Sequence, residues 1–208
     1  MSNLTNKNIL LCVTGGIAAY KAAELVRLLK TSNAFVKVLM TKSAQEFITP
    51  LTMQALSGEK VHTDLLSTEA EAAMGHIELA KWCDLILIAP CSANSLSKIA
   101  EGRGDDLLSA VCLATESEIF IAPAMNQAMW KDKRTQKNLS KSIKAGLNVI
   151  GPASGEQACG DVGDGRMTEP AEIVSEVEKT LEKGLLTGKK VIITAGPTQE
   201  MIDPVRYI

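Results

Sequence analysis

An imidazole, an amide and a thiol are the side chains with the clearest potential for chemistry. The chain has two histidines, and one of them, His76, follows Gly75 at the start of a short helical pattern. An imidazole there can act as an acid, a base or an orienting group, although a helix-start histidine bonded to backbone is the commoner explanation. Asn126 directly follows an apolar segment, where its amide can donate and accept hydrogen bonds or cap a helix. Cys159 lies in a Gly-rich segment, where a thiol either delivers a proton or is simply exposed.

Turns of small and hydroxyl-bearing residues follow three of the apolar segments. Glycine in such a turn lets a phosphate approach the backbone N–H groups at a helix N-terminus. Each turn alone is explained as well by a tight turn or a helix N-cap, and the spacing is not that of a dinucleotide-binding GxGxxG motif. All three together favour a phosphate-bearing cofactor. The residues concerned are Gly15, Gly16, Ile17, Thr41, Lys42, Ser43, Ser92, Ala93, Asn94 and Ser95.

Apolar segments alternate with helical patterns along most of the chain, and these elements must position the turns. The sequence predicts strands at 8–13, 35–40, 84–89, 119–122 and 147–150, and helices at 18–29, 92–100, 106–114, 138–145 and 171–183. Strands that are apolar throughout and separated by helices indicate a parallel sheet covered on both faces. We therefore predict an α/β fold with a doubly wound, Rossmann-like parallel sheet, whose ligands bind beyond the carboxyl ends of the strands. The Gly-rich stretch 151–168 is expected to be a long loop.

The composition argues against several classes of protein. Apolar residues make up 46% of the 208 residues, enough for a sizeable core, and the formal net charge of -2 gives no support for a nucleic acid or an anionic membrane as partner. No apolar run approaches the roughly 20 residues of a membrane span, and the polar N-terminus is unlike a signal peptide. Five cysteines without a CxxC pair argue against a disulfide framework or a metal site, and they suit the reducing cytoplasm.

Three motifs together make the chain resemble the homo-oligomeric flavin-containing cysteine decarboxylases. They are Gly75-His76, the run Pro-Ala-Met-Asn-Gln-Ala-Met-Trp at 123–130, and Ala-Cys-Gly-Asp at 158–161, and the likeness covers residues 6–183. The resemblance implies a flavoprotein-type fold and non-covalently bound FMN, held by the three turns and by Ala124. It also implies FMN-dependent oxidative decarboxylation of 4'-phosphopantothenoylcysteine to 4'-phosphopantetheine in coenzyme A biosynthesis, without a metal.

Roles for the site residues also follow from the resemblance. His76 would act in the oxidative decarboxylation as a base or an orienting group, and Cys159 would donate the proton in the last step. Asn126 would hold the substrate carboxylate, with Ala158 and Met167 belonging to a flap that closes over it. In this family the flavin site lies at the contact between the protomers of a trimer, and bacterial members assemble four trimers into a dodecamer.

The end of the chain resembles a different enzyme. Residues 188–208 are similar to the opening of a phosphopantothenate–cysteine ligase, so we expect a decarboxylase domain at 1–187 and only the start of a ligase domain, without ligase activity.

Three alternatives stay open: a peptidyl-cysteine decarboxylase, a flavin prenyltransferase and a non-catalytic flavin-binding regulatory subunit. The ligase-like end argues against the first, and the motif around Asn126 together with Cys159 argues against the second. The presence of His76, Asn126 and Cys159 argues against the third. Cys91 follows a strand near the expected flavin and is either a reactive thiol or, more simply, part of the core.

Overall fold

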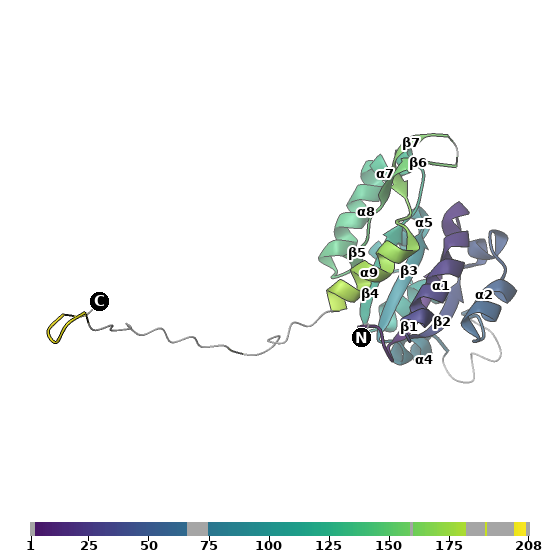
Figure 1. Cartoon of the computed structure of the whole chain (residues 1–208). Helices are drawn as coiled ribbons and strands as arrows, with labels where there is room; N and C mark the ends of the chain where they lie inside the picture. Colours follow the sequence, from purple (N-terminus) through teal and green to yellow (C-terminus); the bar gives the residue numbers. More distant parts are fainter. Residues whose placement is uncertain (1–2, 66–74, 159, 182–189, 191–201, 207–208) are drawn as a thin grey trace.

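A parallel sheet of five strands forms the centre of the fold (Figure 1). The computed structural model describes residues 3–65, 75–158, 160–181, 190 and 202–206. In spatial order the strands are β2 (Phe35–Met40), β1 (Asn8–Val13), β3 (Leu85–Cys91), β4 (Glu118–Pro123) and β5 (Asn148–Val149), and all neighbouring pairs run parallel. The order of connection reverses between β1 and β3, and in this class of fold ligands bind at such a switch point.

Both faces of the sheet are buried, as the apolar strands predict. In β1, Ile9 and Leu11 belong to one core, whereas Leu10 and Cys12 belong to the other, and all four side chains are 0% exposed. Successive residues of a strand point to opposite faces, so a strand that serves two cores must be apolar at every position.

Helices cover the two faces of the sheet in separate layers (Figure 1). One core is covered by α1 (Lys21–Thr31), α2 (Pro50–Ser57) and α9 (Pro170–Leu181). The other core is covered by α4 (Gly75–Trp82), α5 (Ala93–Ala100), α6 (Leu107–Ala114) and α8 (Lys133–Lys144). Three shorter elements, η1 (Ile17–Tyr20), η2 (Lys42–Glu46) and α7 (Gln127–Lys131), follow β1, β2 and β4. The doubly wound α/β fold is therefore confirmed.

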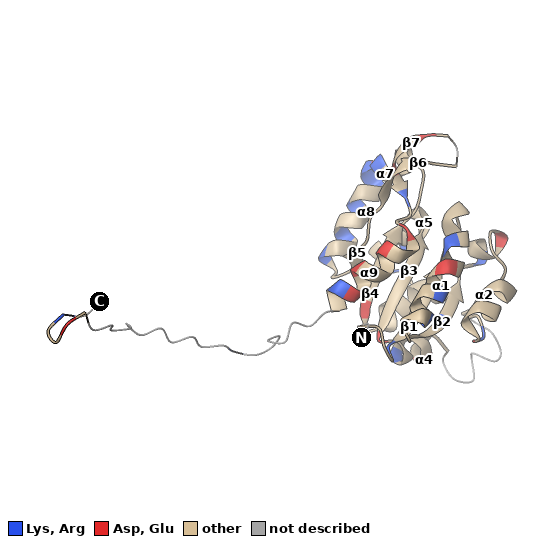
Figure 2. Cartoon of the chain, viewed as in Figure 1, with Lys and Arg blue, Asp and Glu red and all other residues tan. Residues whose placement is uncertain are grey.

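The surface helix α8 is amphipathic. Leu139 packs against a core and Ser142 is buried, whereas most of the Lys and Arg residues that recur along the helix in Figure 2 are exposed. The helix begins before the predicted start at residue 138, because Asp132 caps it: its Oδ1 accepts the N–H of Arg134 at 2.8 Å.

The expectation of a loop over 151–168 is wrong, because this stretch contains an antiparallel hairpin. β6 (Ala153–Glu156) pairs with β7 (Val162–Arg166). Few apolar residues mark these strands, so the hairpin depends on backbone pairing and on docking against α7 rather than on a buried apolar face. Of the ligase-like segment, only residues 190 and 202–206 are described. Within the described part of the chain, no helix is long and apolar enough to cross a membrane.

Candidate functional site

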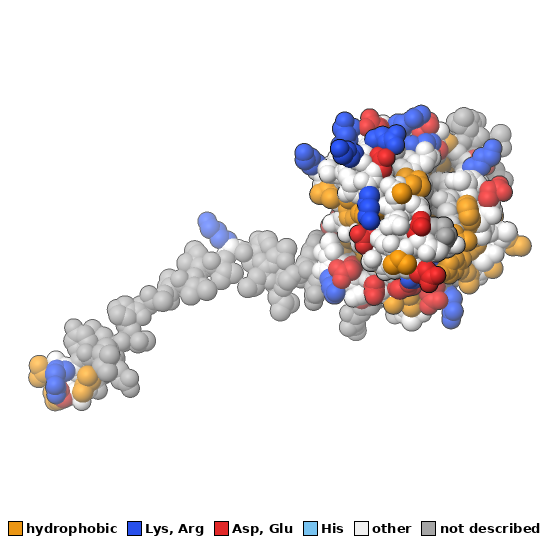
Figure 3. Space-filling view, turned by 90° about the horizontal axis from the view of Figure 1, so that it is seen from above, with side chains coloured by type: hydrophobic (Ala, Val, Ile, Leu, Met, Phe, Trp, Pro, Cys, Tyr) orange, Lys and Arg blue, Asp and Glu red, His pale blue; other side chains and the backbone are white. Residues whose placement is uncertain are grey.

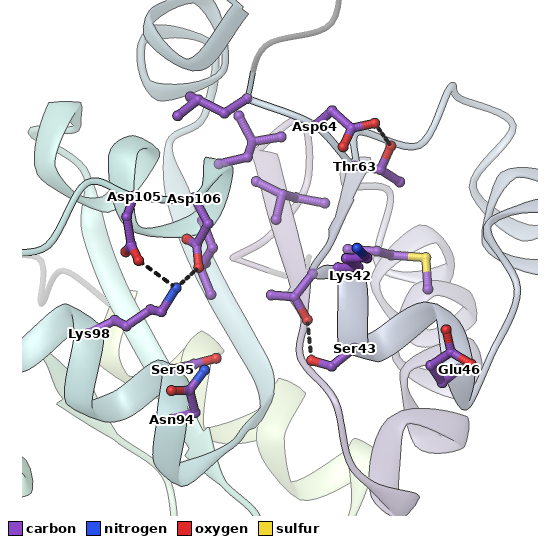
Figure 4. A pocket seen from close by; sticks show the side chains of 16 residues that line it. Lys42, Ser43, Glu46, Thr63, Asp64, Asn94, Ser95, Lys98, Asp105 and Asp106 are labelled. Carbon is purple, nitrogen blue, oxygen red and sulfur yellow. Dashed lines mark hydrogen bonds and ion pairs between the residues drawn. The ribbon is translucent and has the colours of Figure 1, made fainter.

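A first cavity of about 770 Å³ opens beyond the carboxyl end of β2 (Figure 4). Five of the predicted cofactor-binding residues line it. They are Thr41, Lys42 and Ser43, which follow β2, and Asn94 and Ser95 on α5. Residues before α6 close a further side. The volume falls within the roughly 300–1,000 Å³ that is usual for small-molecule sites, so the cavity is large enough for a nucleotide-sized cofactor.

A buried hydroxyl joins the ends of two central strands next to this cavity. Thr14 is 0% exposed, and its Oγ1 donates to the carbonyl of Pro90 at 2.8 Å and accepts the N–H of Ser92 at 2.9 Å. Ser92 in turn caps α5, since its Oγ accepts the N–H of Ser95 at 3.3 Å. Thr14 therefore sets the position from which α5 presents its first residues to the cavity.

The turn after β1 lies against the turn after β2. A Cβ atom added at Gly15 would lie 2.5 Å from Ser43 Oγ, so only glycine allows this approach. Gly15, Gly16 and Ile17 are nevertheless not among the residues that line the first cavity, and neither are Ser92 and Ala93. Gly15 packs against Ser43 and Ser92 caps α5, so these two residues support the cavity wall without lining it. The contact of all five residues with a cofactor stays a prediction.

Sequence reasoning missed an ion-pair cluster on the wall of the first cavity. Lys98 Nζ lies 3.1 Å from Asp105 Oδ2 and 2.7 Å from Asp106 Oδ2 (Figure 4). The hydrogen bond to Asp106 raises the pKa of Lys98, although burial acts in the opposite direction. Burial raises the pKa of Asp106, but hydrogen bonds from Lys98 and Ser109 outweigh it and lower that pKa overall. Asp106 also caps α6, since its Oδ1 accepts the N–H of Ser109 at 2.8 Å.

A second cavity of about 560 Å³ lies between α1, the loop after β4 and the hairpin. It brings together four predicted residues that are far apart in sequence: Ala124, Asn126, Ala158 and Met167. The structure adds Lys21, Gln157 and Arg166 to its lining, none of which sequence reasoning had singled out.

Lys21, the first residue of α1, lines the second cavity and bonds two residues that follow the hairpin. Its side chain is almost fully buried, and its Nζ donates to Glu169 Oε1 at 2.8 Å and to the carbonyl of Met167 at 3.3 Å. The hydrogen bond from Lys21 lowers the pKa of Glu169, and Arg166 at 3.2 Å acts in the same direction. The carboxylate of Glu169 thus compensates the buried ammonium.

Asn126 presents the donor end of its amide toward a carboxylate. As the N-cap of α7, it uses Oδ1 to accept the N–H of Ala128 at 2.8 Å, which fixes the sense of the amide. Its Nδ2 donates to Asp161 Oδ2 at 2.9 Å. Met129, on the same short helix, is 49% exposed.

The three predicted catalytic residues are not gathered around one cavity in the described structure. His76 is the second residue of α4, half-buried, and it lines neither cavity. Cys159 lies outside the described residues, although its neighbour Ala158 lines the second cavity. Of the three, only Asn126 is seen to line a cavity that a single chain forms.

Cys91 is a core thiol in this structure. It is 0% exposed, lines neither cavity, and burial raises its pKa to about 12. A thiol with so high a pKa carries almost no thiolate at neutral pH, so Cys91 is part of the core and not a reactive thiol.

Comparison with known proteins gives the family. A family model described as Flavoprotein matches residues 1–182. The chain therefore belongs to the flavoprotein family. A second model, the DNA/pantothenate metabolism flavoprotein C-terminal domain, matches residues 186–208.

Flavoprotein relatives with curated names are longer than this chain. The coenzyme A biosynthesis bifunctional protein CoaBC of Vibrio cholerae is 56% identical over 208 residues, which are 100% of this chain and 52% of that protein. The protein of the same name from Escherichia coli K12 is 50% identical over 207 residues, 99% of this chain and 51% of that protein. The chain thus spans about half the length of the curated relatives it matches.

Solved structures of flavoproteins share the fold. A PPC decarboxylase mutant complexed with pantothenoylaminoethenethiol superimposes with a TM-score of 0.75 at 34% identity, covering 86% of this chain and 100% of that one. The FMN binding protein AtHal3 gives a TM-score of 0.72 at 34% identity, covering 84% and 96%.

Proposed function

We propose that this flavoprotein binds FMN in the first cavity. The hydroxyls of Thr41 and Ser43, the amide of Asn94 and the ammonium of Lys42 line it, and these groups suit a ligand with a ribityl chain and a phosphate. The contact between Gly15 and Ser43, which any added Cβ would break, keeps the two turns close enough to act on one ligand. The name of the FMN binding protein AtHal3, at 34% identity, supports this cofactor. Bound FMN supplies hydride-transfer chemistry.

We further propose that the chain decarboxylates 4'-phosphopantothenoylcysteine to 4'-phosphopantetheine in coenzyme A biosynthesis. The observation that carries this proposal is the Asn126 amide, whose Nδ2 donates to the Asp161 carboxylate beside a cavity of about 560 Å³. Because the Nδ2 group of Asn126 already donates to a carboxylate, it has the chemistry and the orientation to bind the carboxylate that the substrate loses as CO2. The name of the CoaBC proteins supports a place in coenzyme A biosynthesis, and the pantothenoylaminoethenethiol bound to the PPC decarboxylase mutant supports the pantothenoyl part of the substrate.

Residues of this chain then have separate tasks around the substrate. Asn126 Nδ2 binds the substrate carboxylate, and the cap to Ala128 prevents the amide from turning its oxygen toward it. Met167 and Ala158 supply an apolar wall that excludes water from the reacting carbons. We retain His76 as the base or orienting group and Cys159 as the final proton donor, both as predictions from the family resemblance.

We also propose that the protein forms trimers and, from them, a dodecamer. In the expected trimer the flavin lies between protomers, so a neighbouring chain can supply groups such as His76 that line no cavity here. Ile17 and Tyr20, in the short η1 that follows the turn after β1, are 63% and 61% exposed, and a protomer contact would cover them. Hydrophobic side chains also reach the surface between charged ones in the view of Figure 3. A cytoplasmic location stays a prediction from the cysteine pattern.

The choice of substrate tests the proposal against the other flavoprotein activities. The purified yellow protein is offered 4'-phosphopantothenoylcysteine, a peptide that ends in cysteine, or a prenyl phosphate with reduced FMN, and CO2 and products are measured. We expect CO2 and 4'-phosphopantetheine from the first substrate only. Turnover of the peptide or the prenyl phosphate instead would refute the proposal in favour of those enzymes, and no turnover with bound FMN would favour a regulatory subunit.

Two variants test the predicted roles of the residues that the geometry leaves open. Cys159→Ser should still release CO2 but form little 4'-phosphopantetheine, because the final proton is missing. His76→Asn should stay yellow and lose CO2 release. Normal product formation by the first variant, or a colourless second variant, would show that the assigned role is wrong.

A further inference from the structure

The hairpin is hydrogen-bonded to the main chain on both sides of Asn126. The N–H of Met125 donates to the carbonyl of Gly165 on β7 at 2.9 Å. The N–H of Gln127 donates to the side-chain Oε1 of Gln157 at 3.0 Å. The residues immediately before and after Asn126 are thus both anchored to the hairpin.

Two glycines allow this close approach. A Cβ atom on Gly165 would overlap the carbonyl oxygen of Met125, and one on Gly163 would overlap the side chain of Gln127. Gly165 also has φ +132°, a conformation that other residues rarely adopt. The backbone of β7 therefore lies directly against the loop that carries Asn126.

Gln157 is the side chain that joins these parts. Besides accepting from Gln127, its amide donates through Nε2 to the carbonyl of Asp164 at 3.3 Å, with the carbonyl of Met125 at 3.4 Å. Its own N–H donates to the carbonyl of Asp161 at 2.7 Å, and Asp161 is the residue whose carboxylate binds Asn126. One amide thus touches the chain before Asn126, the chain after it and the opposite strand.

We propose that Gln157 is the positioning residue for Asn126 and sets its amide for recognition of the substrate carboxylate. This inference rests on the proposed function. It predicts that loss of the Gln157 amide weakens recognition of ligands that carry this carboxylate and spares ligands that lack it. Gln157 itself need not touch the reacting atoms, because it acts through the main chain of residues 125 and 127.

The test compares substrate with product, because 4'-phosphopantetheine lacks the carboxylate but shares the rest of the molecule. In Gln157→Met, which keeps length and volume but has no amide, we expect kcat/KM for the substrate to fall about tenfold. The inhibition constant of 4'-phosphopantetheine should change by less than about twofold, since that ligand makes no use of Asn126. Bound FMN, measured by absorbance, should be unchanged.

A matched control comes from the other end of α7. Gln136 also bonds a backbone carbonyl, donating through Nε2 to the carbonyl of Trp130 at 2.5 Å, but near the C-terminal end of α7, whereas Asn126 caps its N-terminal end. Gln136→Met should leave both constants unchanged. If Gln157→Met acts only through packing, it should weaken kcat/KM for the substrate and binding of the product equally, or Gln136→Met should have the same effect. Either result would overturn the positioning role.

A third variant separates this inference from the proposed function. Asn126→Asp replaces the donor by a carboxylate and should abolish CO2 release. If it does so while Gln157→Met behaves like wild type, the positioning role is wrong and the proposed function stands. If Asn126→Asp turns over normally, the role of Asn126 and with it the positioning role of Gln157 are wrong. If the wild-type protein itself releases no CO2, the proposed function is wrong.

Discussion

Replacement of Thr14 by valine should destabilise the fold and loosen the flavin site together. Valine keeps the shape of threonine, so the change removes only the hydroxyl that bonds Pro90 at 2.8 Å and Ser92 at 2.9 Å. Thr14 is 0% exposed and Pro90 is buried, so water cannot replace the bond between them without opening the core. Leaving the buried carbonyl of Pro90 unpaired costs about 1–3 kcal/mol, and losing the part-buried bond from Ser92 costs about 0.5–1.5 kcal/mol, so we expect a loss of about 1.5–4.5 kcal/mol in the free energy of unfolding.

Urea unfolding of Thr14→Val and wild type at the same FMN concentration measures this loss, since bound ligand itself adds to stability. Thr14→Ser, which keeps the hydroxyl, serves as the control and should lose clearly less. Because Ser92 caps α5, the dissociation constant of FMN should rise in the valine variant as well. A loss below about 0.5 kcal/mol, or equal losses for serine and valine, would refute the reasoning.

Three further predictions follow from the two cavities and the core. Gly15→Ala should weaken FMN binding at least about tenfold, read from flavin fluorescence, because its Cβ would lie 2.5 Å from Ser43 Oγ; unchanged binding would contradict the packing. Asp106 has a lowered pKa, so its contribution to stability is full above the ordinary pKa of about 4 and is lost as pH falls through the folded value. Asp106→Asn should therefore flatten the fall of the urea midpoint between about pH 5 and pH 3, and a profile parallel to wild type would count against this. Cys91, with a pKa of about 12, should resist iodoacetamide at about pH 8 until the chain is unfolded, and rapid labelling of the native protein would disprove its burial.

The strands of the sheet could be predicted from the sequence because apolar residues mark each of them. β1 and β2 begin and end at the predicted residues, since each is a mostly apolar run bounded by polar or turn residues, with Lys37 the one charged residue inside β2. The two-sided burial follows from the same pattern, whereas the strand order, and with it the switch point between β1 and β3, is known only from the structure. The start of α8 was missed because residues 133–137 are polar, and the cap by Asp132 rather than an apolar stripe determines where the helix begins.

The hairpin could not be predicted by this reasoning, because no apolar periodicity marks its strands. Val162 is its one large apolar strand residue, and it is 70% exposed. Backbone pairing within the hairpin holds the element, together with the contact of Gly165 with Met125, which lies 40 positions away in the sequence. The positioning role of Gln157 was invisible for the same reason.

The grouping of Asn126, Ala158 and Met167 came from the family resemblance and not from local pattern. These residues lie on three segments, and only the folded chain places them in one cavity. The pair Lys98 and Asp106 was missed because each reads locally as an ordinary surface residue of a short helix. Ion pairs between neighbouring helices depend on how the helices pack, which the sequence alone does not specify.

Dependence of CO2 release on bound flavin tests the central claim most directly. The protein is stripped of cofactor, and CO2 release from 4'-phosphopantothenoylcysteine is measured while FMN is added back in steps. We predict no release at zero FMN and a rise in proportion to bound FMN that levels off at one FMN per chain. Release that is already full without FMN, or none at saturating FMN, would contradict the account.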